Sequence, residues 1–300
     1  MGGIGTTVPG YTCRLEEHMI HERAQDWLSK TQLPPVDSAE ETEIGFLSLP
    51  EDIATLERLR TTAYSGLPNL SRVPTDVFVW RAGEPTRREV TKIAGLPHRR
   101  AELPWPLAPS GEPLTFVAQF CFADSRDLVP PLPGDILLIF GAGEPSSLSD
   151  IRFDDVNWGG GLSFEWAMLD DAPLVESADI PLTPWWPVLP CYGAVQRLWD
   201  YRGVPPEIAV DVPAIVEGTK IGGLCPWLDE PDYVRTDLET NTPGAPGVYL
   251  CTLASVDSNV FAALPGLPPD SRALMISDAG LLNLFLDDHG RIRWTAHGQT

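Results

Sequence analysis

Hydrophobic positions are spaced in two different ways along this chain. Before residue 70, apolar residues recur at the three- and four-residue spacing of amphipathic helices, with charged residues between them. This spacing predicts one helix over residues 12–30 and a second from Pro50 to about Tyr64. In the second segment, acidic residues occupy the expected first turn and arginines lie nearer the end, as the helix dipole favours.

From residue 76 onward the apolar runs become short and are separated by Gly and Pro. Many short runs with turn residues between them are typical of a mainly β fold. The predicted strands are Asp76–Trp80, Leu114–Phe122, Asp135–Phe140, Leu162–Met168, Gly247–Leu253, Ala273–Ile276, Leu281–Leu286 and Ile292–Trp294. Short helices are predicted at Tyr192–Tyr201 and Asp257–Ala263, and the polar segment 142–160 is predicted to be a loop.

A hexapeptide occurs twice in the chain. The sequence TKIAGL at 91–96 returns as TKIGGL at 219–224, and Lys92 and Lys220 are two of only three lysines. Each copy is followed by a tryptophan and then by two apolar runs in the same order. This order predicts an internal duplication in which two β-rich repeats pack around a pseudo-twofold axis and form one core.

The predicted fold is therefore mainly β, a β-rich α+β roll with N-terminal helices. Residues 1–74 form a helical extension packed on the core, 75–185 the first repeat and 186–300 the second, together one compact unit. The proline-rich stretch Leu182–Pro190 marks the expected boundary between the repeats.

The repeated hexapeptides contain candidate turn and binding residues. Gly95 in one copy, and Gly222 and Gly223 in the other, indicate backbone with positive φ or a close approach to another strand. Three interpretations of the lysines stay open. Their ammonium groups either bond nearby carbonyls, reach into a groove between the repeats, or are simply solvated on a turn.

At these residues the chain resembles the YwqG-like family of bacterial proteins, a domain of unknown function. The resemblance covers roughly residues 75–295 and depends on an ordered series of short motifs. These are Thr91–Pro97, Trp105–Pro106, Leu114–Gln119, Leu132–Phe140 and, in the second copy, Lys220–Gly223.

The resemblance implies a mainly β, roll-like fold with an internal duplication. No enzymatic activity is established for the family, and some members resemble immunity proteins encoded beside secreted bacterial toxins. This chain departs from the family pattern at Ala94, which replaces a glycine, at His98–Arg99–Arg100, and at Pro226–Trp227–Leu228. These departures weaken the inference of a shared ligand more than the inference of a shared fold.

The charge of the chain excludes some classes of partner. The formal net charge is −21, and the acidic excess lies almost entirely after residue 100. Nucleic acids and anionic membranes are bound by basic surfaces, so neither partner is expected. An acidic surface attracts a basic protein, although the same charge also keeps a tryptophan-rich chain in solution.

Cysteine usage and the N-terminus predict a cytoplasmic protein. The five cysteines contain no C-x-x-C pair, and Cys121 and Cys251 lie in apolar runs, as free buried thiols do. No signal peptide is visible, and the apolar runs are shorter than the roughly 20 residues that span a bilayer.

The chain has no recognisable catalytic or cofactor motif. G-x-S-x-G, G-x-G-x-x-G and Walker sequences are absent. His18 and His21 have an incomplete metal-ligand spacing and are interpreted as a solvated helix face, and the paired acids as surface turns. No cofactor or metal is expected, and an enzyme is the less favoured interpretation.

These observations lead to one main functional hypothesis and a rival. The first is a non-enzymatic protein-binding module, with an immunity protein that neutralises a basic toxin as one form of it. The rival is a small-ligand-binding protein or an uncharacterised enzyme with a pocket between the repeats. Candidate binding residues are Lys92, Lys220, Trp105, Gln119 and Trp227, and candidate turn residues are Gly95, Pro97, Gly222 and Gly223. Gln119 lies inside an apolar run, so it needs hydrogen-bond partners such as the backbone of the turn, or a ligand.

Overall fold

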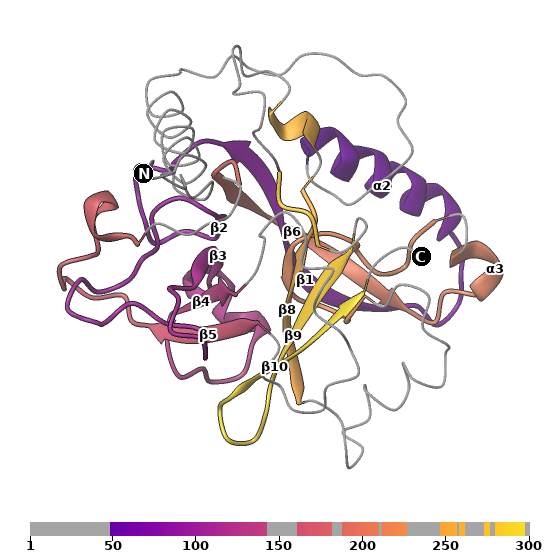
Figure 1. Ribbon diagram of the computed structural model, residues 1–300. Coiled ribbons are helices and arrows are strands. Elements are labelled where there is room, and N and C mark those ends of the chain that lie inside the picture. Colours follow the sequence, from indigo (N-terminus) through magenta and orange to yellow (C-terminus); the bar gives the residue numbers. More distant parts are fainter. Residues whose placement is uncertain are drawn as a thin grey trace, which may run out of the picture.

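The computed structural model of this chain is mainly β (Figure 1). It describes residues 49–142, 161–181, 188–209, 212–226, 247–256, 258–261, 273–276 and 280–297. The predicted helix over 12–30, nearly all of the predicted loop 142–160, most of Leu182–Pro190, and Trp227 lie outside these residues.

Within these described ranges, ten antiparallel strands form one sheet. The strands are β1 (Ser71–Ala82), β2 (Lys92–Ile93), β3 (Thr115–Cys121), β4 (Ile136–Gly141), β5 (Leu162–Ala167), β6 (Cys191–Arg202), β7 (Lys220–Gly222), β8 (Val248–Ala254), β9 (Leu281–Leu286) and β10 (Ile292–His297). The helices are α2 (Pro50–Ala63) and α3 (Pro206–Ala209), with short 3-10 turns η1 (Ala123–Leu128), η3 (Ser177–Asp179) and η4 (Ser258–Phe261).

The helix predicted from Pro50 is confirmed as α2. Proline begins the helix, where its missing N–H costs nothing, and the Asp52 carboxylate accepts the Leu49 N–H at 2.8 Å. Ile53 and Leu56 face the sheet and pack on residues of β1 and β6, including Val77 and Leu198. The helix therefore covers one face of the two longest strands.

Most of the predicted strands are confirmed, and two local predictions are wrong. The predicted helix at Tyr192–Tyr201 is strand β6, which pairs with β1 along its whole length. The periodicity of a short segment does not reveal this long-range pairing, which decides its structure. The predicted strand at Ala273–Ile276 is not a strand, although Leu274 and Ile276 lie beside the end of β8 through bonds to Val256 and Ser255.

The order of strands across the sheet is β10-β9-β8-β7-β1-β6-β2-β3-β4-β5. Strands β2 to β5 therefore lie on one side of the central β1–β6 pair, and β7 to β10 on the other. Strand β1 is followed in the chain by β2 to β5 but lies next to β7, and β6 is followed by β7 to β10 but lies next to β2. Strand β1 pairs with β7, and β6 pairs with β2.

The two sides of the sheet share several local features. The β3–β4 register shifts between Phe116 and Ala118, and the β8–β9 register shifts between Tyr249 and Cys251. The hydroxyl of Thr91 accepts an N–H of β3, and the hydroxyl of Thr219 accepts an N–H of β8. These matched features support the duplication inferred from the sequence, which stays a prediction.

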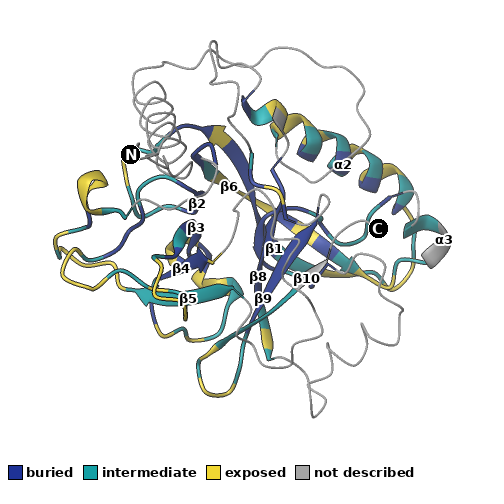
Figure 2. Cartoon of the chain, viewed as in Figure 1, coloured by how far each residue is buried: buried dark blue, intermediate teal, exposed yellow. Residues whose placement is uncertain are grey.

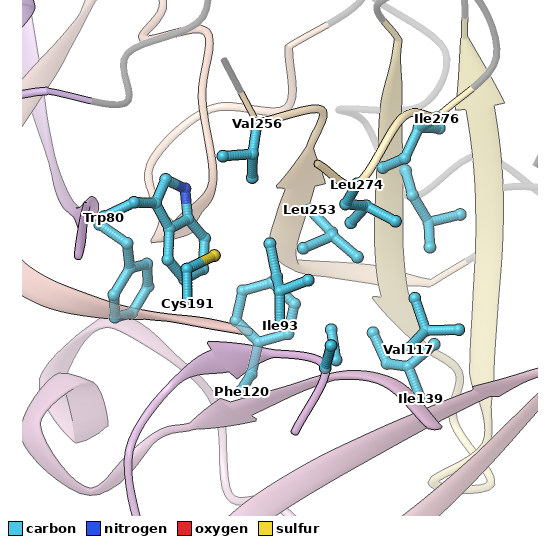
Figure 3. Close-up of a cluster of buried hydrophobic side chains, with 14 of the residues drawn as sticks. Trp80, Ile93, Val117, Phe120, Ile139, Cys191, Leu253, Val256, Leu274 and Ile276 are labelled. Carbon is cyan, nitrogen blue, oxygen red and sulfur yellow. The ribbon is translucent and has the colours of Figure 1, made fainter. Parts of the chain in front are cut away.

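The main hydrophobic core contains side chains from both sides of the sheet (Figures 2 and 3). Ile93 and Phe120 come from β2 and β3, and Leu253 and Leu284 from β8 and β9. All four are at most 1% exposed. The junction between the two sides is therefore filled with apolar side chains.

Candidate functional site

The repeated hexapeptides have similar backbone conformations. Ala94 and Gly95 follow β2 with φ of 53° and 71°, and the corresponding Gly222 and Gly223 have φ of 69° and 76°. Glycine adopts this left-handed conformation without the steric cost that a Cβ imposes. The prediction of positive φ from the paired glycines is confirmed, and Ala94 adopts the same conformation despite its side chain.

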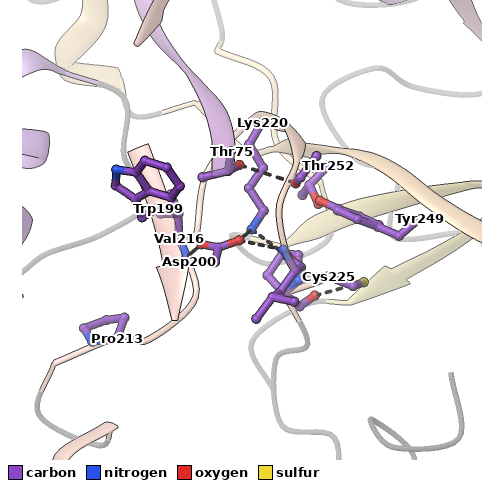
Figure 4. Close-up of polar contacts among 12 residues, drawn as sticks. Thr75, Trp199, Asp200, Pro213, Val216, Lys220, Cys225, Tyr249 and Thr252 are labelled. Carbon is purple, nitrogen blue, oxygen red and sulfur yellow. Dashed lines mark hydrogen bonds and ion pairs between the residues drawn. The ribbon is translucent and has the colours of Figure 1, made fainter. Parts of the chain in front are cut away.

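Lys220 lies at the centre of a buried polar cluster (Figure 4). Its ammonium group donates to the Asp200 carboxylate at 2.7 Å and to the Leu224 carbonyl at 2.6 Å. The same carboxylate accepts the N–H groups of Val216 and Leu224, each at 2.7 Å. Lys220 and Asp200 are fully buried. Burial lowers the pKa of Lys220, and the charge of Asp200 opposes that shift.

Lys92 has a comparable partner on the other side of the sheet. Its ammonium group forms an ion pair with Glu84, and the Glu84 carboxylate also accepts the N–H of Leu96 at 3.2 Å. Lys92 is 1% exposed, but the Glu84 side chain is 25% exposed. Burial lowers the pKa of Lys92, and Glu84 opposes that shift. This pair therefore reaches the surface at its carboxylate.

Each lysine thus ties the end of its own hexapeptide to a carboxylate earlier in the chain. The interpretation of Lys92 and Lys220 as solvated surface lysines is wrong, because both are buried. Lys220 bonds a local carbonyl, as one interpretation predicted. The ammonium group of Lys220 bonds Asp200 of the central strand β6, and that of Lys92 bonds Glu84, just after the central strand β1. Both ion pairs therefore tie a turn to the central strand pair.

Gln119 lies next to Lys92, because the two residues are paired on β3 and β2. It is fully buried, accepts the N–H of His98 at 2.8 Å and donates to the carbonyls of Arg88 and Val90. The prediction that a buried Gln119 needs hydrogen-bond partners is confirmed, but these partners are backbone groups on either side of residues 91–96 and not those of the turn itself. Its hydrogen-bonding groups are all used by the protein itself.

Trp105 belongs to a different part of the molecule from Lys220. Its indole N–H donates to the Leu114 carbonyl at 2.7 Å, and its ring packs edge-on against Phe140 at 5.5 Å. The Arg99 guanidinium lies 5.5 Å from the ring centroid. Trp105 thus packs with a smaller hydrophobic cluster on the β3–β4 side of the sheet.

A buried arginine that the sequence pattern did not reveal ties a loop to strand β5. Arg99 is buried, pairs with Glu165 at 2.8 Å, and donates to the carbonyls of Leu103 and Pro104. The backbone around Arg100 also pairs with residue Leu174. Residues 100–113 and 168–179 are thereby held side by side, and we call them the loop surface. The departure from the family pattern at His98–Arg99–Arg100 was the available signal.

The loop surface is both apolar and acidic. Four of its large hydrophobic side chains are exposed to solvent: Leu103 (40%), Leu107 (58%), Met168 (51%) and Leu169 (39%). It also carries six exposed carboxylates and one arginine: Glu102, Glu112, Asp170, Asp171, Glu176, Asp179 and Arg100. Figure 2 shows these loops largely in the colour of exposed residues, on the side of β5.

The described residues offer little reactive chemistry. No group of three or more His, Cys, Asp or Glu side chains among them could hold a metal ion. Burial raises the pKa of the thiols of Cys121, Cys191 and Cys251, so these groups are poor nucleophiles at neutral pH. No helix in the described ranges is long and apolar enough to cross a membrane.

Comparison with known proteins gives no relative for this chain. No family model matches it, and a search of the curated proteins found no significant match. The resemblance to the YwqG-like family therefore stays a prediction from the motifs alone.

Proposed function

We propose that this chain is a non-catalytic protein-binding module of the YwqG-like type that captures a basic partner protein through the loop surface. One observation carries this proposal. Exposed apolar side chains and an excess of carboxylates lie together on two loops that pair at Arg100 and Leu174, and the buried Arg99 ties the first loop to Glu165 of β5. Apolar side chains of this kind provide binding energy, while surrounding charges select the partner and speed its approach.

The state of the candidate site residues supports a binding role over catalysis. Lys92, Lys220 and Gln119 are buried, and their polar groups bond protein atoms. A nucleophile or general base must instead reach a substrate. These residues therefore stabilise the fold that presents the loops.

The rival hypothesis of a pocket between the repeats gains less support. Small-ligand sites are concave and place a few polar groups among apolar ones. The junction between the two sides of the sheet holds a shared hydrophobic core, and Trp105 packs in a separate cluster. A packed junction favours binding at the surface.

The family resemblance suggests what the partner is. Some YwqG-like proteins resemble immunity proteins, and a basic toxin is complementary to the acidic loop surface. We therefore propose a cytoplasmic immunity protein that masks a toxin encoded by a neighbouring gene.

Co-expression with the product of that neighbouring gene tests the proposal. We expect the parent chain to protect cells, and the double variant Leu107→Ser, Met168→Ser to protect them poorly. The matched control is Val248→Ser, which removes a side chain of 47% exposure away from the loop surface. It should protect as well as the parent.

Association kinetics of the purified pair provide the second measurement. Added salt should slow association, because screening weakens the attraction between an acidic surface and a basic partner. Equal protection by the loop variant and the parent, or an association rate that salt leaves unchanged, would contradict the proposal.

A further inference from the structure

Strand β5 ends the sheet and has one free edge. Its only neighbour in the order of strands is β4. At one end of this pair the Ala142 N–H donates to the Gly161 carbonyl, and at the other the Asp135 N–H donates to the Ala167 carbonyl. Because the direction of backbone bonding alternates along a strand, only the odd-numbered residues of β5 bond β4. The even-numbered residues direct their backbone groups to the free edge.

The free edge consists of the backbone groups of Leu162, Phe164 and Trp166. Within the described ranges, no residue accepts a hydrogen bond from their N–H groups or donates one to their carbonyls. All six residues of β5 are partly exposed, whereas all six residues of β4 are buried, and Figure 2 shows this contrast in colour. An unpaired edge of this kind is a template for another strand.

The side chains of the same three residues favour such an addition. Leu162, Phe164 and Trp166 pack against the margin of the main core and remain partly exposed. A further strand beside β5 would bring its own side chains over them, because residues paired across an antiparallel ladder lie on the same face. The apolar area covered in this way stabilises the pairing.

The free edge also leads into the loop surface. β5 ends at Ala167, and Met168 and Leu169, both exposed, follow it directly. The carboxylates of Asp170 and Asp171 come next in the chain. A strand that pairs with β5 therefore reaches the apolar and acidic loop surface at one of its ends.

We propose that the basic partner protein adds an extended segment of its own to the free edge of β5. This inference rests on the proposed function and states how the partner binds. Neighbouring strands in the described sheet are antiparallel, and antiparallel addition places the N-terminal end of the segment beside Met168. Basic residues there complement Asp170 and Asp171, and the alternating apolar residues that follow cover Phe164 and Trp166.

Charge favours a basic protein over a second copy of this chain at the free edge. Two copies that paired through β5 would bring together two molecules that each carry a net charge of −21. The same acidic surface attracts a basic segment and speeds its approach. The added strand therefore comes from a different, basic protein.

Amide hydrogen exchange of the parent chain, alone and mixed with the product of the neighbouring gene, tests this inference. In the mixture, the amides of Leu162, Phe164 and Trp166 should exchange roughly tenfold more slowly than in the free chain, because carbonyls of the partner accept them. The amides of Ser163 and Glu165 should be slow in both samples, since they bond β4.

Three results overturn the inference, and they differ in what they mean for the proposed function. Slowed exchange in the loop surface together with unchanged exchange at the three edge amides overturns strand addition alone. No slowing anywhere overturns strand addition and the proposed function together. Slowing of the edge amides in the free chain as its concentration rises shows that a second copy, and not a basic protein, occupies the edge.

A proline at the free edge gives a second measurement. Leu162→Pro removes one outward N–H at the first residue of β5, a position where sheets tolerate proline. Leu162→Ala is the matched control, since it also loses the leucine side chain but keeps the N–H. We expect Leu162→Pro to bind the neighbouring gene product about tenfold more weakly than Leu162→Ala, with thermal unfolding confirming that both are folded. Equal affinities of the two folded variants contradict strand addition.

Discussion

At the scale of single residues, the two lysines share a role but differ in their exposure to water. Lys220 and Asp200 are both fully buried, whereas the partner of Lys92 is 25% exposed. Water can therefore solvate the Glu84 carboxylate if Lys92 is lost, but it cannot reach Asp200 if Lys220 is lost. This difference decides how much each ion pair matters for folding.

We predict that Lys220→Met lowers the free energy of unfolding by about 3–5 kcal/mol, because it leaves a buried carboxylate without its cation. Lys92→Met is the matched comparison and should cost only about 1–3 kcal/mol, since Glu84 regains water. Urea denaturation of both variants measures the difference. Equal losses would mean that Asp200 finds other compensation.

The sequence identified the two lysines as important residues, but it did not identify the side chains that surround them. The repeated hexapeptide identified both lysines and the positive φ of the glycines. The two acidic partners, Glu84 and Asp200, were not found, because they lie at different distances before their lysines. An ion pair between residues of unequal separation leaves no repeated pattern.

At the scale of elements, the turn after β7 is a tightly packed part of the fold. A Cβ on Gly223 would overlap the Asp200 carboxylate and the side chain of Thr75. The turn thus admits the carboxylate only because this position has no side chain. By contrast, a Cβ on Gly111, which also has positive φ, would meet open space.

We expect Gly223→Ala to destabilise the protein by about 3 kcal/mol, from backbone strain together with overpacking. Gly111→Ala carries the strain alone and should cost about 1–2 kcal/mol. Thermal unfolding of the two variants compares them. A Gly223→Ala variant no less stable than Gly111→Ala would show that the carboxylate moves aside freely.

Element prediction succeeded where local pattern decides the structure. The apolar runs that form β3, β4, β8 and β9 are long enough to be recognised as strands from the sequence. Strands β2 and β7 are two and three residues long, too short for any period to appear. The loop surface was missed because it depends on Arg99 bonding residues on two separate segments.

At the scale of the whole molecule, β1 and β6 join the two sides of the sheet. They pair with each other, and in addition β1 pairs with β7 and β6 pairs with β2. The strands β2 to β5 are therefore not bordered by β1, which precedes them in the chain, and the strands β7 to β10 are not bordered by β6. A half of the chain on its own would expose the strand edges and apolar faces that the other half covers.

We predict that two fragments, cut between Pro181 and Val188, fold only together. Each fragment expressed alone should not yield a folded monomer, and co-expression should give a one-to-one complex. Circular dichroism and size-exclusion chromatography of the fragments, singly and mixed, provide the measurement. A folded, monomeric single fragment would show that the leading strand can return to its own side.

The central strand pair also has a consequence for synthesis on the ribosome. β1 leaves the exit tunnel early, but its two neighbours are made more than a hundred residues later. At ordinary translation rates of about 5–20 residues per second, both backbone edges of β1 wait several seconds or more for the strands that pair with them. The unpaired edges of β1 in the nascent chain are therefore open to pairing with other strands until the last third of the polypeptide arrives.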